Sequence, residues 1–146
     1  MKPLALLAGL MTLSAVGSMN IASSTDLPVN MVGSWSATGV GGQVSVGQQT
    51  LFSRPLSPPE PLPASARVTQ LNWRITLLSA PPPGLQISLC TQSVCFALQG
   101  LSGARQMSAS LPADQTFHFV YLVASRGPLM PALQVVSNQL TVNYGQ

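Results

Sequence analysis

The amino-acid sequence predicts an all-β fold, a small antiparallel β-sandwich of about eight short strands that follows an N-terminal signal peptide. Short segments in which apolar and polar residues alternate recur along the chain, and glycine or proline separates them. This period of two is typical of strands with one buried face. After the N-terminal segment, no stretch repeats its apolar residues with the period of an amphipathic helix.

Residues 1–22 have the organisation of a secretory signal peptide. Lys2 lies in a short basic start, residues 4–16 form an uncharged apolar run, and small residues follow. The run is shorter than the roughly 20 apolar residues of a membrane helix, and the alternative is an uncleaved anchor or a buried helix. We expect cleavage within 17–24, which leaves residues 23–146 as a single β-sandwich domain with no stable membrane span.

Charged residues are few in the expected mature chain. Cleavage removes the only lysine, Lys2, so the positive net charge comes from a small excess of arginine over acidic residues. The arginines are scattered, not clustered as on a nucleic-acid-binding face, and we expect no nucleic-acid partner. A neutral polar surface gives little charge repulsion and permits a homo-oligomer. The charged residues concerned are Arg54, Arg67, Arg74, Arg105, Arg126, Asp26, Glu60 and Asp114.

Two strands are expected before a proline-rich region. Trp35 marks the first strand, over residues 34–38, and Val44 and Val46, continuing towards Leu51, mark the second. The intervening Gly39-Val40-Gly41-Gly42 lacks the Lys-Ser/Thr pair and the helix that follow a phosphate loop, so we expect a turn.

The middle of the chain pairs a loop with a strong strand signal. Residues 53–66 contain five prolines and are expected to form a stiff surface loop, with a proline-recognition ligand as the alternative. Residues 67–78 alternate over their whole length. Trp73 is in phase with the apolar residues of this strand, which favours a core position over a ligand platform, and Arg74 lies on the polar face.

The segment 84–100 predicts a β-hairpin that organises the domain. If Cys90 and Cys95 lie opposite each other, one register places every large apolar residue on one face and both sulfurs on the other. In an oxidising compartment these cysteines should form a disulfide, which fixes the register and contributes about 2 kcal/mol on the chain-entropy model. Half of a metal site is the alternative, with His118 as the only histidine available to complete it.

The C-terminal part is expected to add four strands and to carry no catalytic site. The strands are predicted at 105–111, 117–123, 132–136 and 139–144, with the third and fourth separated by Ser137-Asn138. Both faces of 117–123 are apolar, which indicates a central or doubly covered strand. His118 within it is expected to be a polar strand residue without a catalytic role.

The residues show no catalytic constellation. No serine lies in a Gly-x-Ser-x-Gly elbow, and the three acids are far apart in the sequence. Four residues separate the cysteines, unlike the Cys-x-x-Cys of redox enzymes. We therefore expect a protein that is not an enzyme, with no catalytic residue, no cofactor and no metal site.

Motifs in the C-terminal half, together with Trp73-Arg74, resemble the flagellar FlhE family. The N-terminal part departs from the family pattern, and so do the neutral residues Val94 and Phe96. The motifs are Pro83-Gly84-Leu85, Leu89-Cys90, Gln92-Ser93 with Cys95, Gly100 with Ser102-Gly103, Phe119-Val120, Leu129-Met130-Pro131-Ala132-Leu133, Ser137-Asn138-Gln139 and Val142-Asn143-Tyr144.

This resemblance implies a periplasmic, non-enzymatic accessory protein of flagellar biosynthesis. Its partners would be flagellar export or rod components. It would limit proton leakage through the export apparatus, or act as a chaperone against flagellar assembly in the periplasm. We expect docking through an exposed strand edge or apolar patch near the C-terminal strand. The candidate partner contacts are Arg74, Asn138, Gln139, Asn143 and Tyr144.

A carbohydrate- or peptidoglycan-binding β-sandwich module in the periplasm is the alternative function. Trp35, Trp73 and Tyr121 would then have to be exposed together as a stacking platform. Trp73 and Tyr121 are in phase with apolar residues of their strands, which argues against this platform.

Overall fold

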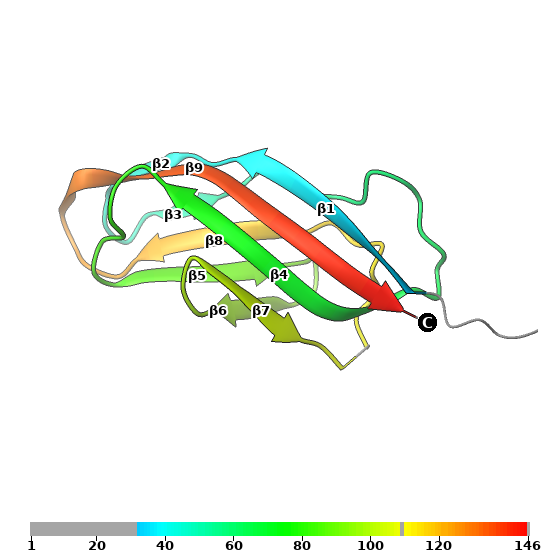
Figure 1. Ribbon diagram of the computed structural model, residues 1–146. Coiled ribbons are helices and arrows are strands. Elements are labelled where there is room, and N and C mark those ends of the chain that lie inside the picture. Colours follow the sequence, from blue (N-terminus) through cyan, green and yellow to red (C-terminus); the bar gives the residue numbers. More distant parts are fainter. Residues whose placement is uncertain (1–31, 109, 146) are drawn as a thin grey trace, which may run out of the picture.

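The computed structural model describes residues 32–108 and 110–145, which form nine strands in two antiparallel sheets (Figure 1). One sheet has the order β1-β9-β4-β7, with β2 also paired to β9, and the other has the order β3-β8-β5-β6. The strands are β1 (Val32–Val40), β2 (Gln43–Val46), β3 (Thr50–Phe52), β4 (Arg67–Leu77), β5 (Leu85–Cys90), β6 (Cys95–Leu98), β7 (Ser102–Gln106), β8 (His118–Val123) and β9 (Pro128–Gly145). The predicted all-β sandwich is confirmed, and the expected signal peptide lies outside the described residues.

The core lies between the two sheets and follows the alternation of the sequence. In β8, Phe119, Tyr121 and Val123 are fully buried, whereas the residues between them are half-buried. Trp73 faces the core from β4, as its phase predicts. Trp35 of β1 is also buried, and its indole Nε1 donates a 3.0 Å hydrogen bond to the carbonyl oxygen of Ala113.

The central hairpin has the predicted register. Cys90 pairs with Cys95, Leu89 with Phe96, and Ile87 with Leu98. The two cysteines form a disulfide. The prediction succeeded because a shift of one residue would turn the apolar side chains away from the core.

The C-terminal strand differs from its prediction. The structure has one strand, β9, where we expected two strands separated at Ser137-Asn138. β9 pairs with β1 along one side and with β4 along the other, so the expectation of an exposed C-terminal edge is wrong. The polar pair does not end the strand because Asn138 is buried and hydrogen-bonded inside the sandwich.

Two other strands are placed differently from the prediction. The expected second strand, from Val44 to Leu51, divides into β2 and β3, which pair with β9 and β8 and so belong to different sheets. Gln48, with a φ of 65°, lies in the turn between them. The strand expected at 105–111 is β7, which starts and ends earlier because the residues that pair with β4 run from Ser102 to Gln106.

Candidate functional site

The outer face of the β1-β9-β4-β7 sheet carries three of the expected partner contacts. Arg74 of β4 lies directly opposite Gln139 of β9, and both side chains are exposed. With Asn72 and Thr141 they line a shallow depression of about 380 Å³. Asn143 lies on the same face, four residues after Gln139 on β9, because residues an even number apart on a strand share a face.

This outer face is neutral apart from arginine. Hydroxyl groups pair across it, as between Ser36 and Thr141, whose oxygens are 2.8 Å apart. Arg74 makes no hydrogen bond or ion pair with another residue among those the structure describes. An exposed guanidinium without a partner can bind a carboxylate or another anionic group in two-pronged geometry.

The other two expected contacts, Asn138 and Tyr144, face the interior. The Asn138 side chain is fully buried and accepts a hydrogen bond from the hydroxyl of Tyr121. Tyr144 is half-buried against the core, and its ring lies over Gly33, where an added Cβ would come within 2.6 Å of the ring. The structure therefore brings Arg74, Gln139 and Asn143 together on one surface and separates Asn138 and Tyr144 from it.

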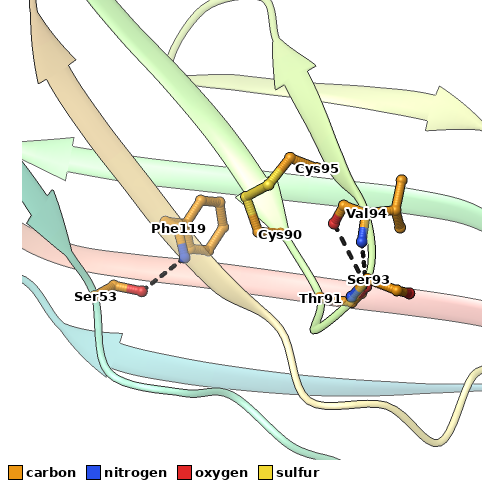
Figure 2. Close-up of a disulfide and its surroundings, with 7 residues drawn as sticks. All are labelled: Ser53, Cys90, Thr91, Ser93, Val94, Cys95 and Phe119. Atoms are coloured by element: carbon orange, nitrogen blue, oxygen red, sulfur yellow. Dashed lines mark hydrogen bonds between the residues drawn. A yellow bond between two sulfur atoms is a disulfide. The ribbon is translucent and has the colours of Figure 1, made fainter.

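The disulfide fixes one end of the other sheet (Figure 2). In the loop between the cysteines, Oγ1 of Thr91 accepts hydrogen bonds from the backbone N–H of Ser93 and of Val94 at 3.3 and 3.2 Å. Nearby, the backbone N–H of Phe119 donates a 2.8 Å hydrogen bond to Oγ of the buried Ser53. The Thr91 hydrogen bonds hold the loop, and the Ser53 hydrogen bond joins the segment after β3 to β8.

A polar depression of about 580 Å³ lies beside this loop. Its lining includes Ser93, Asp114 and His118, the residue types of a hydrolase triad. In the described part of the chain no hydrogen bond joins any two of them, and the His118 ring instead lies 6.0 Å from the ring of Phe52. The sequence does not predict this group of residues, because the loop that holds Ser93 approaches Asp114 and His118 only in the folded sheet.

The platform required by a carbohydrate-binding module is not present at the expected residues. Trp35, Trp73 and Tyr121 are all in the buried core. Their rings pack against other core residues and cannot stack on a sugar. This observation removes the three-residue platform on which the alternative function depended.

Comparison with known proteins assigns the chain to a family. A family model described as Flagellar protein FlhE matches residues 41–145. The chain belongs to the FlhE family. The match includes β2 to β9, and the proline-rich loop lies within it.

Curated FlhE proteins and an FlhE structure agree with this assignment. The chain is 39% identical to Flagellar protein FlhE of Yersinia enterocolitica over 81% of its length and 86% of the relative. It is 36% identical to Flagellar protein FlhE of Escherichia coli strain K12, over 77% of the chain and 85% of the relative. A solved structure titled "Crystal Structure of FLHE" superimposes with a TM-score of 0.71 at 38% identity, covering 77% of this chain and 96% of that one.

Membership of the FlhE family confirms the resemblance that the C-terminal motifs indicated. The names of the relatives describe flagellar proteins and indicate no catalytic activity. Within residues 32–108 and 110–145, no helix is long and apolar enough to cross a membrane.

Proposed function

We propose that this chain is a non-enzymatic accessory protein of flagellar biosynthesis that acts in the periplasm. The observation that carries the proposal is the FlhE family match over residues 41–145. The Cys90–Cys95 disulfide supports an oxidising compartment, since such bonds persist in exported proteins and are rare in the cytoplasm.

We consider two alternative roles for such an accessory protein. The protein limits proton leakage through the flagellar export apparatus, or it acts as a chaperone that prevents flagellar assembly in the periplasm. The geometry favours the chaperone role, because edge strands such as β7 present backbone groups on which an unassembled subunit can pair. Flagellar export or rod components are the partners we propose, and Arg74, Gln139 and Asn143 are the residues we propose as contacts.

The test is a deletion of the gene in a motile host. We expect flagella within the periplasm by electron microscopy, at unchanged cytoplasmic pH when the flagellar genes are induced. Acidification of the cytoplasm without misplaced flagella would instead assign the protein to proton-leak control. A deletion strain with normal motility, normal flagella and normal cytoplasmic pH would contradict both roles.

A further inference from the structure

The β7 side of the sandwich is open. β7 forms the end of its sheet, and β6 forms the end of the other sheet (Figure 1). All five residues of β7 are exposed. Between the two strands lies a groove of about 480 Å³, whose apolar lining comes from Val94, Phe96, Met107 and Leu111.

The hydrogen-bond pattern shows which backbone groups of β7 are free. The carbonyl oxygen of Leu101 accepts from Ile75, and the N–H of Met107 donates to Thr69, so these flanking residues direct their backbone groups towards β4. In an antiparallel pair alternate residues have the same direction. Ser102, Ala104 and Gln106 therefore direct their N–H and C=O groups away from β4, where no other strand of the described residues pairs with them.

Arg105 lines the groove and packs against the β6 side of it. Its guanidinium carbon is 5.1 Å from the centre of the Phe96 ring, and Nη1 donates a 3.2 Å hydrogen bond to the carbonyl oxygen of Ala97 on β6. The groove lining contains no acidic side chain, and Arg105 forms no ion pair with a described residue. The positive charge in the groove is thus available to a ligand.

We propose that β7 and this groove bind an extended acidic peptide segment as an added strand. The backbone of the segment pairs with Ser102, Ala104 and Gln106, which is the mode of β-strand addition. Its alternate side chains then point into the groove, where apolar groups contact Phe96 and Met107. A central carboxylate pairs with Arg105, whose planar guanidinium suits this partner. The inference deepens the proposed function, since it names the kind of partner segment that the chaperone would hold.

Charge favours such a peptide over a second copy of this chain. If two β7 strands paired over their full length about a twofold axis at Ala104, each Arg105 would be diagonal to the other copy's Arg105, roughly 7–8 Å away. The groove supplies no acid to compensate these two charges. A peptide carrying an aspartate or glutamate at the same place removes the repulsion and gains a charge-assisted hydrogen bond.

The test measures binding of a labelled synthetic peptide, Thr-Val-Thr-Asp-Thr-Val-Thr, by fluorescence anisotropy. Ala104→Pro removes the outward N–H of β7 while leaving its bonds to β4, because proline is tolerated where the N–H faces away from the sheet. We expect Ala104→Pro to bind the peptide at least about tenfold more weakly than wild type does. Arg105→Gln should bind it about tenfold more weakly than wild type. Arg126→Gln is the matched control, since it removes the same charge from an exposed position between β8 and β9 that does not line the groove, and its affinity for the peptide should stay unchanged.

A second peptide and a second measurement make the result independent of variant folding. With asparagine in place of the aspartate, wild type should lose its advantage over Arg105→Gln. In the wild-type protein, the Asp peptide should slow amide hydrogen exchange at Ala104 and Gln106. Absence of peptide binding, equal binding by Ala104→Pro, or unchanged exchange at these amides would overturn the proposal. A wild-type dimer that Ala104→Pro abolishes would overturn it in favour of a second copy. These outcomes do not depend on the flagellar phenotype of the deletion strain.

Discussion

The hydroxyl of Tyr121 donates a hydrogen bond to Oδ1 of Asn138, and this contact joins the two sheets across the core. Both side chains are fully buried. The Nδ2 group of Asn138 has no hydrogen-bond partner among the described residues. The pair is therefore a polar contact whose loss leaves buried groups unsatisfied.

Replacing Tyr121 by phenylalanine should destabilise the protein. The substitution keeps the ring but leaves Oδ1 of Asn138 without its donor, and an unsatisfied buried polar group costs about 1–3 kcal/mol. Urea unfolding of wild type and Tyr121→Phe measures the difference. Adding Asn138→Leu to Tyr121→Phe should recover part of the loss, since removing both partners is less costly than removing one. If the double variant were less stable than Tyr121→Phe alone by about 2 kcal/mol, this account of the hydrogen bond would be wrong.

Stability should fall at alkaline pH because of the same tyrosine. Burial raises the pKa of the Tyr121 hydroxyl above its usual value. Above pH about 10 the unfolded chain releases this proton while the folded chain keeps it, so the unfolded state becomes favoured as pH rises. The stabilisation is fully present below pH about 10, and above it the free energy of unfolding should fall by up to about 1.4 kcal/mol per pH unit. Denaturant titrations on both sides of this pH should show a smaller fall in the free energy of unfolding for Tyr121→Phe than for wild type. If the free energies of both proteins fall in parallel with pH, Tyr121 is not the source of the effect.

Gly103→Ala should destabilise the open side of the sandwich. Gly103 lies opposite Trp73, and an added Cβ would come within 2.8 Å of Cζ2 of the indole. The indole is held by a 3.2 Å hydrogen bond from Nε1 to the carbonyl oxygen of Gly100, so it cannot turn away freely. We expect a loss of about 1–3 kcal/mol by thermal unfolding, as for other overpacked sites. Ser102→Ala, exposed on the same strand, is the control and should change stability by less than about 0.5 kcal/mol.

Removing the disulfide should lower stability without changing the register of the hairpin. The chain-entropy model gives about 2 kcal/mol for the short loop between Cys90 and Cys95. The double variant Cys90→Ser, Cys95→Ser should unfold at lower denaturant concentration. Reduction of the wild type should produce the same shift, and reductant should not affect the double variant. An equal response of both proteins to reductant would mean that the disulfide is not the source of the difference.

Local alternation was enough to predict several elements. The register of the central hairpin, the disulfide and the buried phase of Trp73 all follow from residues close together in sequence. The neutral outer surface with Arg74 was also predictable, because charged residues are few and Arg74 is out of phase with the core. The motifs around the cysteines predicted the FlhE family, which the comparisons confirm.

The remaining features depend on contacts between segments far apart in sequence. Ser137 and Asn138 have the composition of a turn, yet burial of Asn138 against Tyr121 keeps β9 continuous. Pairing of β9 with both β1 and β4 makes the C-terminal strand central, and no local pattern indicates this position.

The sequence by itself determined the strand phases, the hairpin register and the family, because a period of two and a fixed cysteine spacing are local properties. Only the tertiary structure decided which strands lie at the edges. It left β7 with one unpaired side beside an apolar groove and a single arginine. The physical reason is that strand order results from the combined burial of apolar faces and pairing of backbone groups over the whole domain, and distant segments contribute to both.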